Sequence, residues 1–385
     1  MTSLIQTIKS LLSQKEPLPP GMLSYQSPQE DENQYRLHLR IEKDGTGLLV
    51  INASTILHLN PTATEFAYYM MQGTDADTIA LTVAQRYQVD QAQARQDYDD
   101  FVEKIETLIT TPDLDPVTFL DIERQEPYTG ENSAPYRLDC ALTYEVGKES
   151  HRDHAPVERV DRELTTAEWV TIFDKAFTNG IPHLLFTGGE PTLREDLPDL
   201  IHEAENIGLV TGLLTDGFKL AEDAYRNALL VNGLDHLVMV FDPDNPKVWQ
   251  ILEKILAEDL FTTVHLTLKE GEDLHPMIAR LSEMGAQALS LSAANKNLTE
   301  SLQDLRDFAA VQQLELIWNL PVPYSRINPV SMELENTEDQ APPEGAGNAW
   351  LYVEPDGDVL PAQGLYDQIM GNMLTDPWEE IWGKR

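Results

Sequence analysis

The sequence predicts an α/β protein: a parallel sheet, open or closed into a barrel, preceded by a small winged-helix-like domain of three strands and three helices. Two observations support this prediction. Between residues 136 and 330, short apolar strand candidates alternate with amphipathic helical segments, as in parallel sheets whose strands are joined by helices. Between residues 35 and 110, three strand candidates precede three segments whose apolar residues have helical spacing. A chain of 385 residues is long enough for two or three domains with separate cores.

The charge balance is strongly acidic. The chain has 65 Asp and Glu against 27 Lys and Arg, a net charge of −38. Such a surface repels phosphates, so neither nucleic acid nor an anionic membrane is expected as a partner. It suits a basic peptide, although the acidity has equally good explanations in solubility or a salty habitat. No apolar run is long enough to span a bilayer and no signal peptide is recognised, so we expect a cytoplasmic protein.

The small domain is predicted from its turns and helix caps. Asn60 suits the N-cap of the first helix and Pro61 its first position. Further helices are expected from Asp75 and from about Gln91. The strand candidates are residues 35–41, 48–51 and 54–59.

The segment Leu59–Thr64 reads LNPTAT, and with the order of strands and helices it resembles the PqqD-like fold. That fold is the small peptide-binding domain of pyrroloquinoline quinone biosynthesis and of many maturases of ribosomally made, modified peptides (RiPPs). The resemblance covers about residues 35–110. It implies that a leader peptide adds as an extra strand to the sheet and lies against the third helix; a capping domain without a ligand is the alternative. The residues expected to contact the peptide are Thr55, Ile56, Leu57, Tyr98 and Phe101.

The octapeptide Thr187–Arg194 reads TGGEPTLR and follows an apolar strand. It closely resembles the S-adenosylmethionine (SAM) site of radical SAM enzymes, whose catalytic domain is a partial barrel of six β/α units. The resemblance implies that glycines let the backbone approach the ligand and that Glu190 helps to hold the SAM ammonium group. The expected SAM-binding residues are Thr187, Gly188, Gly189, Glu190, Pro191, Thr215, Asp216 and Arg326.

Radical SAM enzymes carry a C-x3-C-x2-C loop about forty residues earlier, and its thiolates hold a 4Fe-4S cluster. Here, alignment of the flanking residues places the three cysteine positions on Val146, Ser150 and Asp153. These side chains do not replace three thiolates, and one cysteine, Cys140, cannot hold the cluster. The 4Fe-4S cluster is therefore expected from the family but not from this sequence, and reductive SAM cleavage is predicted to be absent. Cys140 itself is expected to be a small buried hydrophobe.

Two polar segments are weaker candidates. His151, Asp153 and His154 could bind zinc or ferrous iron on a structured loop, but their spacing matches no well-known metal motif, so a solvated loop is favoured. Arg326 lies in a Pro-rich segment after the last strand, where β/α barrels place their sites. It could pair with a carboxylate, or the segment could simply be a rigid exit from the barrel.

Residues 349–361 predict a hairpin, followed by a short helix near Pro377. This end of the chain resembles the SPASM or twitch extension of peptide-modifying radical SAM enzymes, in which a cluster cysteine follows the hairpin. Ala362 stands at that position, so no auxiliary cluster is expected. The expected boundaries are a flexible segment at 1–34, a PqqD-like domain at 35–110, linkers at 111–135 and 331–348, a barrel at 136–330 and a C-terminal remnant at 349–385.

Three functions remain open. The first is a degenerate maturation protein that holds a leader or precursor peptide, with or without SAM, for an active radical SAM partner enzyme. The second is a SAM- or metal-dependent enzyme with non-radical chemistry. The third is a radical SAM peptide maturase as the family implies, which the single cysteine makes the weakest.

Overall fold

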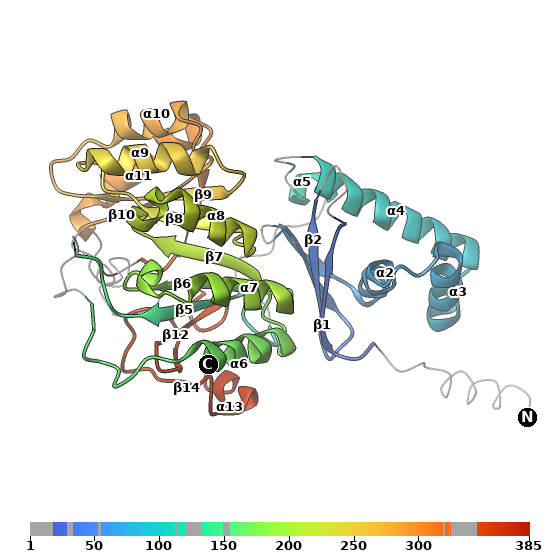
Figure 1. Ribbon diagram of the computed structural model, residues 1–385. Coiled ribbons are helices and arrows are strands. Elements are labelled where there is room, and N and C mark those ends of the chain that lie inside the picture. Colours follow the sequence, from blue (N-terminus) through green and yellow to red (C-terminus); the bar gives the residue numbers. More distant parts are fainter. Residues whose placement is uncertain are drawn as a thin grey trace, which may run out of the picture. The chain divides into compact units, whose positions relative to one another are not determined.

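The computed structural model divides the chain into two compact units, residues 1–129 with 178–180, and residues 130–177 with 181–385 (Figure 1). The structure describes residues 18–28, 34–52, 55–111, 114, 116–120, 132–148, 155–318, 320–322, 324 and 345–385.

The small unit is an antiparallel sheet of four strands in the order β1-β2-β3-β4, followed by helices. The strands are β1 (Gly21–Gln26), β2 (Arg36–Ile41), β3 (Gly47–Ile51) and β4 (Thr55–Leu59). The helices are α2 (Pro61–Met71), α3 (Ala76–Tyr87), α4 (Gln91–Thr110) and the short α5 (Pro116–Leu120).

Strand β1 corrects one expectation, because it lies inside the segment 1–34 that was predicted to be flexible. It pairs with β2 over its whole length, from Gly21 opposite Ile41 to Gln26 opposite Arg36. The rings of Tyr25 and Tyr35 lie 5.7 Å apart, which adds an aromatic contact to this pairing. The Pro- and Gln-rich composition around β1 concealed a strand that an existing sheet edge stabilises.

The LNPTAT segment has a local structural reason. The Asn60 side chain accepts a hydrogen bond from the Ala63 N–H at 2.9 Å and so caps α2, as predicted. The Thr64 hydroxyl donates to the Asn60 carbonyl at 2.9 Å. A side chain on Gly47 would meet Thr64, so β3 and α2 are packed at their closest where the motif lies.

The large unit confirms the partial (β/α)6 barrel. Its sheet has the order β11-β10-β9-β8-β7-β6-β5-β12-β13-β14, and β5 to β11 are parallel. The parallel strands are β5 (Arg137–Thr143), β6 (His183–Gly188), β7 (Val210–Thr215), β8 (His236–Val240), β9 (Phe261–Leu268), β10 (Ala288–Ala293) and β11 (Glu315–Leu316). The helices between them are α6 (Thr166–Thr178), α7 (Leu197–Ile207), α8 (Asp223–Val231), α9 (Pro246–Leu256), α10 (His275–Glu283) and α11 (Thr299–Val311).

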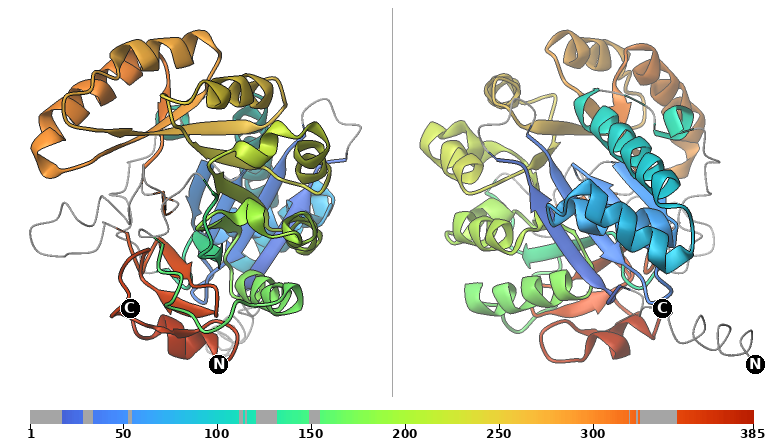
Figure 2. Two further views of the ribbon diagram at one scale, coloured as in Figure 1. Left: turned by 60° about the vertical axis from the view of Figure 1, so that its left-hand side comes forward. Right: turned by 90° about the vertical axis from the view of Figure 1, so that its right-hand side faces the viewer.

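The C-terminal segment continues this sheet. Strand β12 (Trp350–Val353) pairs in parallel with β5, and the predicted hairpin leads into β13 (Asp358–Leu360) and β14 (Gly371–Asn372). Helix α13 (Trp378–Trp382) ends the chain. The segment, red in Figure 2, lies beside α6, where the Lys175 ammonium donates to the Met373 carbonyl at 2.6 Å.

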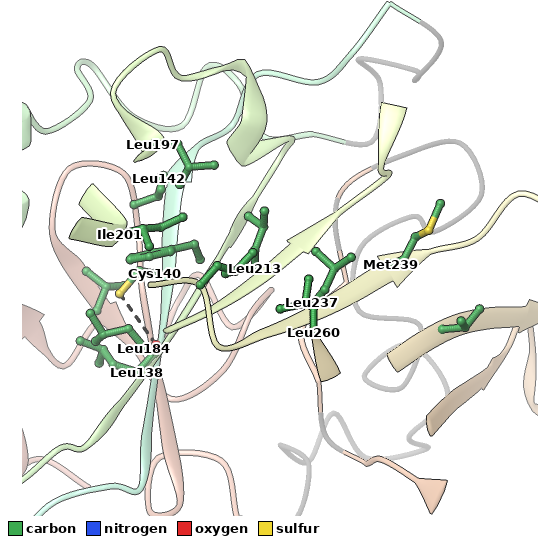
Figure 3. Close-up of a cluster of buried hydrophobic side chains, with 14 of the residues drawn as sticks. Leu138, Cys140, Leu142, Leu184, Leu197, Ile201, Leu213, Leu237, Met239 and Leu260 are labelled. Carbon is green, nitrogen blue, oxygen red and sulfur yellow. Dashed lines mark hydrogen bonds between the residues drawn. The ribbon is translucent and has the colours of Figure 1, made fainter. Parts of the chain in front are cut away.

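Alternate side chains of the barrel strands separate two environments. One set packs under the helices in the main core, where Cys140 is fully buried among Leu138, Leu142 and Leu184 (Figure 3). Burial raises the pKa of the Cys140 thiol well above its usual value, so this cysteine is an inert core residue, as predicted. The other set faces the barrel interior, which is apolar at Leu185, Leu214, Val238 and Val240.

Two histidines, His183 and His236, lie together at the first residues of β6 and β8. The Nε2 atoms of His183 and His236 lie 2.7 Å apart, and the His236 ring occupies the space left by Gly212. Burial, with the charge of Arg137, lowers the pKa of His236 to about 4. The folded state therefore prefers the neutral ring.

We expect this histidine to make stability depend on pH. Its folded pKa is below the ordinary value of 6.5, so the unfolded chain binds more protons and stability falls as the pH falls from 6.5 to 4. Thermal unfolding measured at pH 7 and at pH 5 should show a smaller difference for His236→Gln than for the wild type. His202→Gln, which changes an exposed histidine on α7, is the control, and an unchanged difference in both variants would contradict the assignment.

Candidate functional site

The TGGE turn joins the carboxyl ends of β5 and β6. The Gly189 N–H donates to the Thr143 carbonyl and the Glu190 N–H to the Glu145 carbonyl, both at 2.7 Å. Gly188 has φ +114°, and a Cβ on Gly188 or Gly189 would overlap the backbone of residues 143–145. Both glycines are thus required by the approach of the protein's own backbone.

Glu190 ties this turn to the end of β7. Its carboxylate is 4% exposed and accepts hydrogen bonds from the Thr192 N–H at 3.0 Å, the Thr192 hydroxyl at 2.6 Å and the Thr215 hydroxyl at 2.7 Å. The Asp216 N–H donates to the other carboxylate oxygen at 2.9 Å. Three of these donors meet Oε1 and one meets Oε2, so Oε1 is fully used while Oε2 keeps about one acceptor position. The structure brings Glu190, Thr215 and Asp216 together, and protein donors take up most of the carboxylate's acceptor positions.

The rest of the motif is anchored to the same strand end. Pro191 begins a short 3-10 helix, η2 (Pro191–Leu193). The Arg194 guanidinium donates to the carbonyls of Leu142 and Leu164 at 3.1 and 3.0 Å and pairs with Asp196 at 2.7 Å. The octapeptide therefore connects β5, β6 and the start of α7.

The Thr187 side chain differs from the other polar side chains of this octapeptide. It is fully buried at the end of β6, and within the described part of the chain its hydroxyl has no hydrogen-bond partner. Buried polar atoms are nearly always paired, so an unpaired one marks a position where a ligand or water fits. Thr187 thus retains a hydroxyl that can bind a polar ligand.

The first cluster position does not fit an iron–sulfur cluster. Val146 is 8% exposed and lies in an apolar and aromatic cluster. Its buried neighbours are Ala141, Tyr144, Tyr324, Tyr352 and Leu360. Ser150, Asp153, His151, His154 and Arg326 lie outside the described residues. Within the described residues, no group of three or more His, Cys, Asp or Glu side chains could hold a metal ion.

A buried ionic network lies beside Val146, and sequence reasoning missed it. The Tyr144 hydroxyl donates to Glu354 at 2.7 Å, and Arg159 pairs with the same carboxylate through two nitrogens at 2.5 and 2.6 Å. Burial, with Tyr324 and Glu354 nearby, raises the pKa of Tyr144. The Arg159 guanidinium also lies 4.4 Å from the centre of the Tyr366 ring. These residues are far apart in sequence, so no local spacing could have indicated the network.

The predicted peptide contacts divide between surface and core. Thr55, Ile56 and Leu57 lie on β4, an edge strand paired with β3 within the described sheet. Ile56 is 40% exposed, whereas Leu57 is buried. Tyr98 and Phe101 pack against the Phe66 ring with centroids 5.5 and 6.0 Å apart, so both are mainly core residues of the helices. The exposed part of this candidate site is the β4 edge at Thr55 and Ile56.

No helix within the described ranges is long and apolar enough to cross a membrane.

Comparison with known protein families and sequences agrees with these observations. The family described as Coenzyme PQQ synthesis protein D (PqqD) matches residues 46–107, from β3 into α4. A PqqA peptide cyclase of Streptomyces rochei is 27% identical over 257 residues, which cover 59% of this chain and 70% of that relative.

The fold is also found in solved structures. The crystal structure of Streptococcus suis SuiB bound to the precursor peptide SuiA is similar with a TM-score of 0.59 and 13% identity, covering 94% of this chain and 88% of that one. SuiB bound to S-adenosylmethionine gives a TM-score of 0.58 and 14% identity, covering 91% and 87%. At these identities the likeness shows the fold, and it confirms the predicted fold class.

The close approach at the TGGE turn can be tested by a glycine substitution. Gly188→Ala should destabilise the large unit by at least about 2 kcal/mol, because the added Cβ overlaps the Thr143 carbonyl and φ is positive. Gly285→Ala is the matched control, since Gly285 has φ +86° with open space around it. Denaturant unfolding of both variants gives the loss in free energy of unfolding, and the difference between them separates the overlap with Thr143 from the strain of a positive φ. Equal losses of stability in the two variants would contradict the close approach.

Proposed function

Because the chain is a radical-SAM-type protein with an N-terminal PqqD-type domain, we propose that it is a peptide-binding maturation protein that works without reductive SAM cleavage. It holds the leader or precursor peptide of a RiPP or quinone-cofactor pathway and presents the peptide to a partner that carries the chemistry, in the simplest case an active radical SAM enzyme. The observation that carries the proposal is the combination of an accessible β4 edge with a barrel whose first cluster position is a buried valine.

The peptide-binding part rests on strand addition. The outer edge of β4 presents backbone donors and acceptors, and Ile56 offers an exposed apolar side chain beside them. An extended peptide that pairs with such an edge gains main-chain hydrogen bonds, and its alternate side chains supply specificity. The net charge of −38 favours a peptide with basic residues over an acidic one.

The absence of radical chemistry rests on ligand chemistry. A 4Fe-4S cluster needs three or four thiolates, and the chain has one cysteine, buried under the helices. Val146 offers no ligating atom. The residues of this chain therefore do not fit the cluster.

A second candidate function is binding of SAM or a related ligand without the cluster. The buried Thr187 hydroxyl without a partner favours it, because this atom lies at the strand end where radical SAM folds bind SAM. Such a protein would sense SAM or use it in non-radical chemistry.

The peptide-binding proposal can be tested by selecting binders from a displayed peptide library. Selected peptides should bind Ile56→Asp at least about tenfold more weakly, because a charge beside the β4 edge disrupts strand addition. Ser24→Asp is the matched control, since Ser24 is an exposed residue on β1, at the opposite edge of the sheet. Equal loss in both variants, or a library without binders, would sink the proposal.

The cluster can be tested independently of the peptide. After anaerobic reconstitution with iron and sulfide, we expect no stoichiometric iron, no broad visible absorbance and no 5′-deoxyadenosine on addition of SAM and reductant. A triple Val146→Cys, Ser150→Cys, Asp153→Cys variant shows whether the scaffold still accepts a cluster when thiolates are supplied. A brown wild-type protein that cleaves SAM would restore the radical SAM maturase as its function.

A further inference from the structure

The chain that leaves the last barrel strand reaches the TGGE turn. We define Leu320–Val322 and Tyr324 as the strap. Tyr324 is fully buried, and its backbone N–H donates to the Gly188 carbonyl at 3.4 Å. Leu320 packs against the barrel interior formed by Leu185, Leu214, Val238 and Val240. The strap therefore covers apolar interior side chains and contacts the turn that resembles a SAM site.

One buried side chain of the C-terminal segment fastens the strap. The Gln363 amide nitrogen donates to the Val322 carbonyl at 2.6 Å, and the Val322 N–H donates to the Gln363 amide oxygen at 2.9 Å. The Tyr324 and Tyr366 hydroxyls are also hydrogen-bonded to each other. Both contacts come from the short stretch after β13, so we call Gln363 and Tyr366 the clasp.

The clasp holds the strap where Tyr324 takes up an acceptor position at the TGGE turn. A SAM ammonium group needs carbonyl or carboxylate oxygens, yet the Glu190 carboxylate has four protein donors and the Gly188 carbonyl has the Tyr324 N–H. Opening the strap would release the Gly188 carbonyl, next to the unpaired Thr187 hydroxyl. In the closed form Tyr324 lies against the turn and donates to the Gly188 carbonyl; in the open form this carbonyl and the Thr187 hydroxyl would be available to a polar ligand.

We propose that the strap is a built-in closure of the SAM site. The clasp holds the strap closed, and SAM binds only to the open form. This inference rests on the second candidate function above. A ligand that binds a minor form shows an affinity reduced by the fraction of that form. Weakening the clasp should therefore strengthen binding, which is the opposite of what loss of a ligand contact would do.

The test is a calorimetric titration of the full chain with SAM. Gln363→Leu removes both hydrogen bonds to Val322 and should bind SAM at least about tenfold more tightly than the wild type. Tyr366→Phe removes only the hydroxyl contact with Tyr324 and should give a smaller gain in the same direction. Gln303→Leu is the matched control, because Gln303 pairs with Asp307 on the exposed side of α11. Hydrogen exchange of the Val322 and Tyr324 amides reports whether each variant opens the strap.

The outcomes separate the two proposals. Equal SAM affinity in the wild type and in Gln363→Leu, with faster amide exchange in the variant, overturns the closure and leaves the SAM site standing. If no variant binds SAM although hydrogen exchange shows that the strap is released, both the closure and the SAM site are overturned. If Gln363→Leu does not fold, Tyr366→Phe decides, since it retains the ring and all backbone contacts.

Discussion

The large unit depends on one close contact, the packing of the Gly188–Gly189 turn against the end of β5. The backbones meet so closely that Cβ atoms have no room, and two short hydrogen bonds join them. The turn direction places Glu190 inside, where it binds the end of β7. Three neighbouring strand ends are thereby fixed as one rigid surface. The fold itself needs this turn, which gives the motif a structural role that does not depend on SAM.

Aromatic packing and an ion-paired network stabilise the space next to this turn. Val146 packs among tyrosines, and Glu354 brings Tyr144 and Arg159 into one ion-paired network. Because Glu354 directly follows β12, this network ties the C-terminal segment to the barrel over a long sequence separation. Removing one partner of a buried ion pair leaves the other charge uncompensated, so replacing a single member of this network should destabilise the folded protein.

Much of this architecture could be predicted from the sequence. The barrel strands are continuous apolar runs, and the caps at Asn60 and Asp75 form as local chemistry dictates. Strand β1 could not be predicted, because its stability comes from an edge supplied by β2. Within the site, the proximity of Glu190 and Asp216 follows from parallel strand ends. The hydrogen bond from the Asp216 N–H to Glu190 and the contacts of the clasp could not be predicted, since they join residues whose separation in sequence carries no pattern.

The position of Cys140 on β5 keeps its thiol in the main core and away from the barrel interior. Side chains alternate along β5, so Cys140 shares the helix-facing side with Leu138 and Leu142, while Asp139 and Ala141 face the other way. Bringing the thiol into the barrel would need a one-residue shift of β5, which would move both leucines out of the core. Each leucine buries a side chain worth about 2 kcal/mol, so the shift would cost about 4 kcal/mol from these two side chains alone. Any cluster in this barrel would therefore need its thiolates from outside the chain.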